Sequence, residues 1–245
     1  MEQIEYYFKL NGISPLQILK SNSLSLNNEE AFDKDFFNCF KINRKLLFGS
    51  KNYKKVAFDL YSTFYKNEFV IKTAFINSKL MNSKAICSEE YPLLDSRIDL
   101  ISINGKSIAY EIKTKYDNLK RLNKQLFDYS KCFEFVYVIC SKNKVNSVKL
   151  KVPAYVGIYS YSDKSSKTIF DIERNADYSP NINSRSILAT LSDSEMIRLF
   201  KESNRDKVLQ MFSFDKINLK YKSFLKRKYN KKSTLLREES ISLIK

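Results

Sequence analysis

The sequence has 245 residues and contains no histidine. This absence excludes a Ser-His-Asp triad, a Cys-His catalytic pair, histidine-ligated zinc and iron sites that use two histidines. A general base that acts at neutral pH must therefore be an aspartate, a glutamate, a lysine, a tyrosine or a metal-bound water.

Glycine and proline are scarce, with four residues of each, whereas an average glycine content of about 7% would give roughly 17 glycines. So few glycines exclude a nucleotide site built on a glycine-rich loop, and the scarcity of both residues argues against a propeller or a collagen-like chain. An AT-rich genome explains the same bias. Hydrophobic residues make up 43% and aromatic residues 14% of the chain, which predicts a globular protein of one large or two small domains.

The sequence also lacks closely spaced cysteines and long apolar runs. Its four cysteines are Cys39, Cys87, Cys132 and Cys140. No two of them form a CxxC motif, so they are predicted to be reduced core residues and not zinc ligands. The N-terminus carries Glu2 and Glu5 where a signal peptide would be basic, and no apolar run approaches 18 residues. We therefore expect a cytoplasmic protein with no membrane partner.

Positive charge is what the chain has in excess, with 43 basic and 27 acidic residues and a net charge of +16. Residues 178–245 alone carry 15 basic and 7 acidic side chains. A polyanion such as nucleic acid suits this charge, and a solvated basic helix explains it equally well. Helical spacing within residues 215–229 predicts an inward apolar stripe and an outward cationic face. The stripe consists of Ile217, Tyr221, Phe224 and Leu225, and the cationic face of Lys220, Lys222, Lys226 and Arg227.

Hydrophobic periodicity divides the chain into a helical N-terminal region (1–63), a core (64–177) and a basic helical C-terminal region (178–245). Helices are expected at residues 29–48, at residues 56–80 as one or two helices, at residues 117–132 and from residue 192 onward. Strands are expected at residues 97–103, 106–113, 134–141, 154–161 and 167–173, with a polar turn at residues 163–166. The β-β-α-β order predicts an α/β (α+β) fold with a mixed central sheet of about four to six strands flanked by helices.

The first two of these strands flank Asn104-Gly105, a strong hairpin signal. A two-residue loop would put Asp99 and Glu111 on opposite faces of the sheet, because a shift of one residue reverses every side chain. A three-residue loop closed by Gly105 with a positive φ puts both carboxylates on one face. We expect this longer loop. The pairing that it predicts is Leu100 with Ile108.

Three charged residues, Asp99, Glu111 and Lys113, lie inside predicted strands. Charges there are costly unless they are paired or bound to a metal ion. The two carboxylates and the backbone carbonyl of Ile112 are hard oxygen ligands that suit Mg²⁺ or Mn²⁺. Such an ion lowers the pKa of a bound water, and Lys113 can position that water or stabilise phosphate charge. A structural ion-pair cluster at the sheet edge is the alternative.

These residues resemble the PD-(D/E)XK nuclease superfamily, with Asp99, eleven intervening residues and then Glu111-Ile112-Lys113. The following helix carries Gln125 and Tyr129 one turn apart, and this pair is a mark of the RecB and lambda-exonuclease branch. The matching segment, roughly residues 64–162, is similar to a bacterial and phage family of PD-(D/E)XK-like proteins. Its motifs are Arg97-Ile98-Asp99-Leu100, Tyr110-Glu111-Ile112-Lys113-Thr114, Asp117-Asn118-Leu119-x-Arg121-Leu122 and Gln125-Leu126-x-x-Tyr129. The sequence departs from the superfamily name in having Arg-Ile-Asp where Pro-Asp is typical.

The resemblance implies a restriction-endonuclease-like core and a deoxyribonuclease that depends on Mg²⁺ or Mn²⁺. The catalytic residues that it implies are Asp99, Glu111, Lys113, Gln125 and Tyr129. The metal ligands would be Asp99, Glu111, the carbonyl of Ile112 and Glu68 from a preceding helix. Contacts with DNA are expected from Lys72, Arg97 and Arg121 in the core and from Lys222, Lys226 and Arg227 in the C-terminal region.

Several of these assignments have a structural alternative. Glu68 and Lys72 are four residues apart and could simply form an exposed helix pair. Arg97 contacts a phosphate or pairs with Asp95. Asp117 is expected to cap the following helix and not to bind metal.

Two other functions stay open. A non-catalytic module that retains the nuclease fold, such as a regulator, an immunity-type protein or a subunit of a defence complex, would use the same core. Such proteins usually have an eroded motif, whereas Asp99, Glu111 and Lys113 are all present. No residue distinguishes a DNA-directed from an RNA-directed nuclease.

Overall fold

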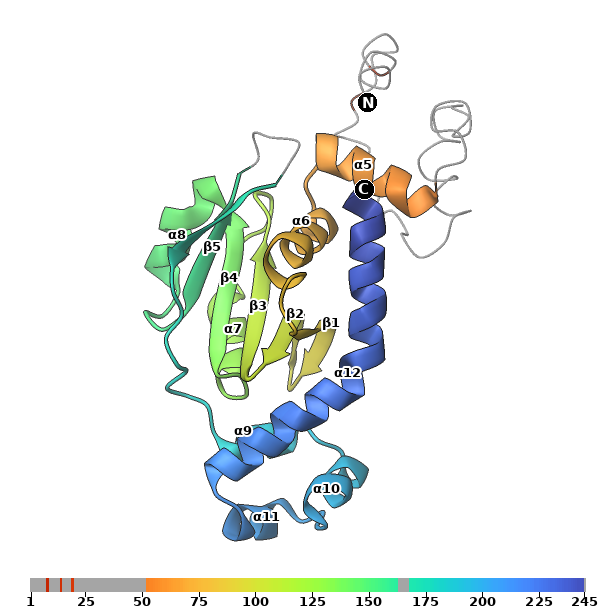
Figure 1. The fold of residues 1–245 in the computed structure, drawn as a ribbon. Coiled ribbons are helices and arrows are strands. Elements are labelled where there is room, and N and C mark those ends of the chain that lie inside the picture. Colours follow the sequence, from red (N-terminus) through yellow and green to blue (C-terminus); the bar gives the residue numbers. More distant parts are fainter. Residues whose placement is uncertain (1–7, 9–13, 15–18, 20–51, 163–167, 245) are drawn as a thin grey trace. The chain divides into compact units, whose positions relative to one another are not determined.

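The computed structural model describes Phe8, Ser14, Leu19, residues 52–162 and residues 168–244. The helix expected at residues 29–48, Cys39 and the turn at residues 163–166 lie outside the described residues. The chain divides into two compact units (Figure 1). One consists of residues 1–74 and 241–245 and the other of residues 75–240, so the boundaries of these units differ from those of the three segments expected from periodicity.

The smaller unit contains α5 (Tyr53–Phe64) and most of α6 (Glu68–Phe75). Asn52 caps α5, since its side-chain oxygen accepts a hydrogen bond from the backbone N–H of Lys54 at 2.9 Å. The core of this unit includes Val56, Leu60 and Val70. Two helices within residues 56–80 therefore confirm the sequence prediction, and a π-helical turn (Ile76–Leu80) follows them.

The larger unit is built on one six-stranded sheet whose strands lie in sequence order. The strands are β1 (Ile86–Leu93), β2 (Ser96–Asn104), β3 (Lys106–Lys113), β4 (Phe135–Ser141), β5 (Gly157–Tyr161) and β6 (Phe170–Arg174). β3, β4 and β5 run parallel, whereas the pairs at both ends of the sheet are antiparallel. The sheet confirms the expected α/β fold with a mixed sheet.

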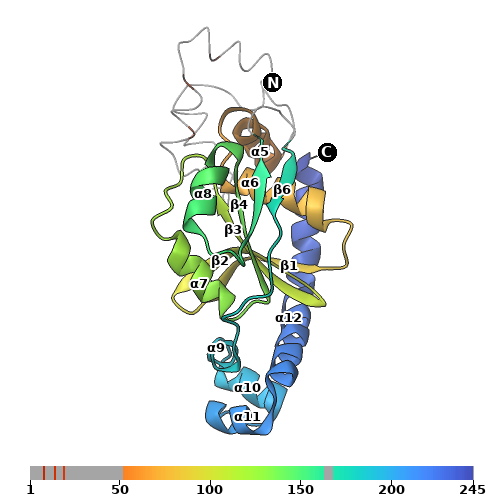
Figure 2. The same ribbon diagram turned by 90° about the vertical axis from the view of Figure 1, so that its left-hand side faces the viewer.

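Helices α7 (Leu122–Ser130) and α8 (Val145–Lys151) connect the parallel strands. Both crossovers advance in the same direction along the sheet, which places the two helices on one face (Figure 2). Four further helices follow, namely α9 (Ser184–Ala189), α10 (Asp193–Phe200), α11 (Arg205–Met211) and α12 (Phe214–Ile244). Among the described residues, no helix is both long enough and apolar enough to cross a membrane.

The sheet is packed on both faces. Leu122 and Leu126 of α7 share a buried apolar cluster with Val136 and Val138 of β4. On the other face, the ring of Phe75 lies 5.1 Å from that of Tyr110 on β3, between ring centroids. Each face of β3 is therefore covered, which explains why five of its eight residues are buried, Glu111 among them.

The long helix α12 packs against this unit through the stripe expected from its sequence. Ile217, Tyr221, Phe224 and Leu225 are all at most 2% exposed. Farther along, α12 follows the free edge of β1, where the hydroxyl of Ser233 accepts a hydrogen bond from the N–H of Cys87 at 2.9 Å. The Lys232 ammonium donates to the carbonyl of Glu89 at 3.2 Å. The helix thus satisfies backbone groups that an edge strand otherwise leaves open to pairing with another chain.

A buried carboxylate, that of Glu134, joins the start of β4 to α12 and to the β2–β3 hairpin. One of its oxygens accepts from the N–H of Ser107 at 2.7 Å, and the other from the Asn218 amide at 2.9 Å and the Lys222 ammonium at 2.7 Å. Lys222 also donates to the carbonyl of Gly105 at 2.7 Å. The expectation that Lys222 faces outward is therefore wrong: only 16% of its side chain is exposed, because a buried charge needs a paired partner.

The hairpin between β2 and β3 confirms one part of its prediction and corrects another. Gly105 has a φ of +74°, as the left-handed turn position requires. The register, however, pairs Leu100 with Tyr110 and not with Ile108. The observed register differs from the expected one by two residues, so Asp99 still shares a face with Glu111.

Two other local details depart from the sequence prediction. Strand β1 was not expected, because Pro92 and the adjacent Glu89 and Glu90 interrupt its apolar pattern. Helix α7 begins at Leu122 and is not capped by Asp117. The Asp117 carboxylate instead accepts from the N–H of Thr114 at 2.7 Å and closes the turn that follows β3.

Replacing Gly105 by valine should lower the free energy of unfolding by about 1 kcal/mol or more, because a β-branched residue tolerates a positive φ poorly. A Cβ at this position would meet no atom within 4 Å, so the backbone conformation alone produces the loss. Urea denaturation measures it. Gly105→Asn is the matched control, since asparagine adopts this conformation more readily, and equal destabilisation of the two variants would contradict the explanation.

Lys222→Ala should lower the free energy of unfolding by about 3 kcal/mol, because it leaves the Glu134 carboxylate buried without its cation. Lys228→Ala is the control, since Lys228 pairs with Glu195 at a more exposed position on the same helix, where an ion pair contributes at most about 1 kcal/mol. Chemical denaturation measures both losses. An equally small loss of stability in the two variants would contradict the stabilising role of the buried Lys222–Glu134 pair.

Candidate functional site

The site begins where β2 and β3 diverge. Their backbone ladder ends at the pair Leu100 and Tyr110, and the next positions are those of Asp99 and Glu111. Beyond this point a side chain replaces the ladder bond: the N–H of Ile112 donates to a carboxylate oxygen of Asp99 at 2.6 Å. The divergence makes room for two carboxylates between neighbouring strands.

Glu111 is the most deeply buried charge of the site, with 1% of its surface exposed. One carboxylate oxygen lies 2.5 Å from the Lys113 ammonium, and the other accepts a hydrogen bond from the Tyr129 hydroxyl at 2.6 Å. The Tyr129 oxygen also lies 2.7 Å from the carbonyl oxygen of Arg97, which belongs to the diverging part of β2. The hydroxyl therefore bridges both strands at the point where they separate.

Tyr129 is fully buried, and its burial raises the pKa of its hydroxyl far above the ordinary value, an effect that the charge of Glu111 reinforces. The negative charge of Asp99 acts in the same direction on this pKa. The hydroxyl is consequently a proton donor throughout the physiological range. It can hold the Glu111 carboxylate in place but cannot serve as a base.

Helix α7 supplies a second contact one turn before Tyr129. The side-chain oxygen of Gln125 accepts from the Lys113 ammonium at 3.3 Å. Residues four apart lie on the same helical face, so α7 holds both the cation and the carboxylate of the site. The structure thus brings together all five residues predicted to be catalytic. Asp99 contacts the backbone of β3, Glu111 contacts Lys113 and Tyr129, and Gln125 contacts Lys113.

The donor set fits a divalent cation of the hard class. Asp99 and Glu111 offer carboxylate oxygens, which Mg²⁺ and Mn²⁺ prefer. Asp99 is partly exposed whereas Glu111 is buried, so an ion bound to the Asp99 carboxylate would be open to solvent. The predicted role of the Ile112 carbonyl stays a prediction, since the observed contact of this residue is made by its N–H.

Glu90 of β1 is a residue of the site that sequence reasoning missed. Its carboxylate lies within 4.8 Å of that of Asp99, oxygen to oxygen. Its φ of +52° is unusual for a residue with a side chain, and it interrupts the pairing of β1 with β2 between Glu89 and Tyr91. Glu90 also forms an ion pair with Arg97 at 2.7 Å, so Arg97 pairs with this residue and not with Asp95. The adjacent glutamates in an otherwise apolar stretch were the available signal.

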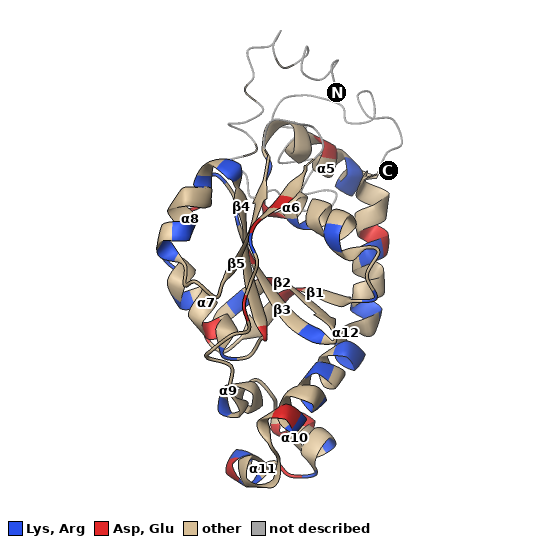
Figure 3. Cartoon of the chain, turned by 60° about the vertical axis from the view of Figure 1, so that its left-hand side comes forward, with Lys and Arg blue, Asp and Glu red and all other residues tan. Residues whose placement is uncertain are grey.

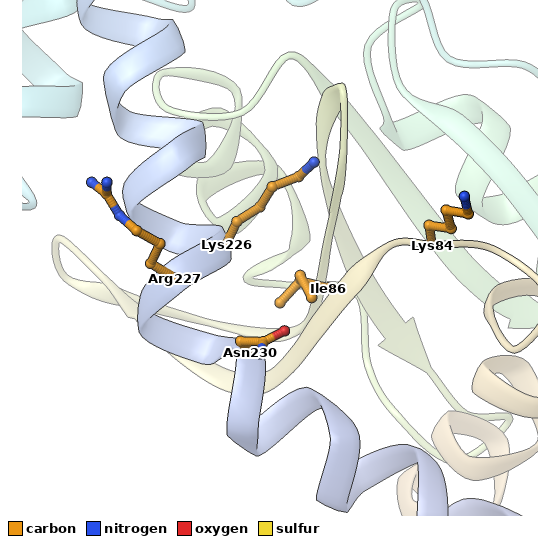
Figure 4. A pocket seen from close by; sticks show the side chains of 5 residues that line it. All are labelled: Lys84, Ile86, Lys226, Arg227 and Asn230. Atoms are coloured by element: carbon orange, nitrogen blue, oxygen red, sulfur yellow. The ribbon is translucent and has the colours of Figure 1, made fainter.

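The remaining predicted residues are more dispersed. Glu68 and Lys72 pair with each other at 3.1 Å in α6, within the smaller unit, so their roles in metal and DNA binding stay predictions. The Arg97 side chain is 71% exposed, and Arg121 is exposed just before α7. Lys226 and Arg227 of α12 line a surface pocket with three other residues (Figure 4).

Comparisons with known proteins show which sequences and structures this chain is similar to. Protein cII of Enterobacteria phage P4 is 31% identical over 106 residues, which are 43% of this chain and 40% of that protein. The chain thus matches less than half the length of this relative. A solved structure, the SPO1766 protein of unknown function from Silicibacter pomeroyi, is 12% identical and covers 52% of this chain and 77% of its own, with a TM-score of 0.32.

The family model of bacteriophage P4 protein cII matches residues 61–243, which include the whole sheet, all five residues of the site and most of α12. The chain therefore belongs to the bacteriophage P4 protein cII family.

Proposed function

We propose that this protein is a metal-dependent nuclease of the PD-(D/E)XK type that hydrolyses phosphodiester bonds of DNA. The observation that carries the proposal is the contact of Glu111 with both Lys113 and Tyr129, beside Asp99. These residues come from β2, β3 and α7, and they include two carboxylates and a lysine at the spacing that the resemblance requires.

Each residue has a role in this reaction. Asp99 and Glu111 would hold Mg²⁺ or Mn²⁺, which when bound lowers the pKa of water and offsets charge on the phosphate. The Lys113 ammonium, 13% exposed, can donate a hydrogen bond to the attacking water or to a phosphate oxygen. Gln125 and Tyr129 position Lys113 and Glu111. Water attacks phosphorus and the bond from phosphorus to the leaving oxygen breaks. The attacking water loses a proton to solvent, and the leaving oxygen takes up a proton from solvent water to become a hydroxyl.

The charge of the chain supports nucleic acid as the substrate class. The net charge is +16, and basic side chains recur along α8 and α12 in the larger unit (Figure 3). Cations placed along a surface attract phosphates independently of base sequence. DNA is the substrate that the resemblance implies, and an RNA substrate is tested beside it.

The second candidate is a non-catalytic binding module with the same fold. It is favoured by the observation that both oxygens of Glu111 already have partners, Lys113 and Tyr129, within the protein. A carboxylate satisfied in this way can be a structural ion pair that needs no metal ion.

Purified protein should cleave linear DNA in the presence of Mg²⁺ or Mn²⁺, and Asp99→Asn and Lys113→Ala should each reduce the rate on the order of 10²-fold or more. Lys115→Ala is the matched control, because Lys115 is an exposed lysine two residues farther along the chain. Gel assays with linear, circular and single-stranded DNA and with RNA measure cleavage.

Equal cleavage by the wild type and Lys113→Ala would indicate a contaminating nuclease, and the proposal would fail. Absence of cleavage together with absence of divalent-metal binding in calorimetry would establish the non-catalytic candidate instead.

Tyr129→Phe should weaken Mn²⁺ binding and cleavage and lower the free energy of unfolding by about 1–3 kcal/mol, because it removes a hydrogen bond to the buried Glu111 carboxylate. Calorimetry and urea denaturation measure the two effects. Tyr116→Phe, at a residue 36% exposed, serves as control. A Tyr129→Phe protein with unchanged stability and metal affinity would rule out the positioning role.

A further inference from the structure

A pocket of about 420 Å³ lies between the start of β1 and the middle of α12, away from the carboxylates of the site. The residues that line it include Lys84, Ile86, Lys226, Arg227 and Asn230. Figure 4 shows Lys226, Arg227 and Asn230 on one stretch of α12, with Lys84 and Ile86 on the segment that leads into β1. Three of the five lining residues are cations, and none is acidic.

The three pocket cations differ from five basic residues of α12 whose side chains are engaged within the protein. Lys220 donates to the carbonyl of Leu199, and Lys228 pairs with Glu195. Lys222, Lys232 and Arg237 likewise bind acceptors within the protein. In the described part of the chain, by contrast, no hydrogen bond or ion pair engages the side chains of the three pocket cations, Lys84, Lys226 and Arg227.

Like charges gathered around one pocket repel each other, and among the described residues that line it no acidic side chain offsets this repulsion. A ligand that carries negative charge relieves it. Guanidinium and ammonium groups bind phosphate oxygens through charge-assisted hydrogen bonds, and the amide of Asn230 adds a polar group at the same wall. The chemistry of the lining therefore fits phosphate.

The directions of the side chains favour several phosphates over one. In Figure 4 the side chains of Lys226 and Arg227 leave α12 in different directions, and Lys84 lies on the opposite wall. A site for a single phosphate brings its donors together around one centre. Cations that spread apart suit successive phosphates of an extended chain.

The pocket also lies at a defined distance from the candidate active site. Ile86 pairs with Ile103 of β2, and Asp99 is four residues from Ile103 along the same strand. At about 3.3 Å per strand residue, the separation along the strands is about 13 Å. A duplex whose axis follows β1 and β2 would span this length with roughly four base pairs at 3.4 Å each.

We propose that this pocket binds the phosphodiester backbone of a nucleic acid, without reading its bases, roughly four nucleotides from the bond that is cleaved. The position relative to the cleaved bond rests on the proposed nuclease function, whereas the binding of backbone phosphates does not. Lys84, Lys226 and Arg227 are the contact residues, and Lys222 is not, because it is bound to Glu134.

Binding of a fluorescent DNA duplex in EDTA, where no cleavage occurs, tests the proposal at several salt concentrations. The triple variant Lys84→Gln, Lys226→Gln and Arg227→Gln should bind at least tenfold more weakly at low salt. The slope of log affinity against log salt should fall by about 0.9 for each phosphate that the variant no longer binds, or about 2–3 in all. Arg227→Gln alone should lower this slope by about 0.9. Circular dichroism and the Tm verify that the variants are folded.

A charge-matched control replaces three exposed lysines outside the pocket, Lys149, Lys151 and Lys216, by glutamine. Equal weakening of DNA binding in the two triple variants would show that only net charge matters and would overturn the pocket. Displacement of DNA by inorganic phosphate, beyond the effect of chloride at equal ionic strength, would point to a single-phosphate site and overturn the extended backbone. The wild-type protein could bind DNA through the pocket and yet never cleave it. That result would support this proposal and overturn the nuclease proposal.

Discussion

The buried carboxylate of Glu111 is the constraint on which the larger unit depends. A charge that is 1% exposed destabilises the fold unless partners surround it, and these partners come from two different elements, Lys113 on β3 and Tyr129 on α7. Helix α7 must therefore dock with Tyr129 facing the sheet, and β2 must separate from β3 so that the hydroxyl also reaches the carbonyl of Arg97. The same arrangement that stabilises the fold assembles a group of side chains able to hold a metal ion.

A second buried carboxylate holds helix α12 at the other end of the sheet. Glu134, also buried, uses Lys222 and Asn218 of α12 and Ser107 of β3 to fix the helix against the hairpin. Whereas Lys222 is used in this way, the neighbouring Lys226 and Arg227 are among the cations of α12 that no side-chain hydrogen bond or ion pair engages in the described part of the chain. A basic helix in this protein thus has two kinds of lysine and arginine, those that hold the fold together and those that lack a partner among the described residues.

Much of the fold and of the site could be predicted from local sequence. Strand β3 was predicted to its exact ends and β4 to within one residue, because a continuous apolar run or regular alternation is a local property of the backbone. Strand β1 could not be predicted, since its pairing with β2 and its cover by α12 compensate for Pro92 and two glutamates. The start of α7 was misplaced because Asp117 can close a turn as well as cap a helix.

The sequence by itself determined which side chains could meet. Alternation along β2 and β3, and the step of four residues on α7, assigned Asp99, Glu111, Gln125 and Tyr129 to one place, because these periods follow from backbone geometry alone. The tertiary structure decided which partner each charged side chain contacts. The register of the hairpin, the approach of Glu90 to Asp99 and the capture of Lys222 by Glu134 all join residues that are distant or unrelated in periodicity. Such contacts depend on how whole elements pack, and no local pattern encodes them.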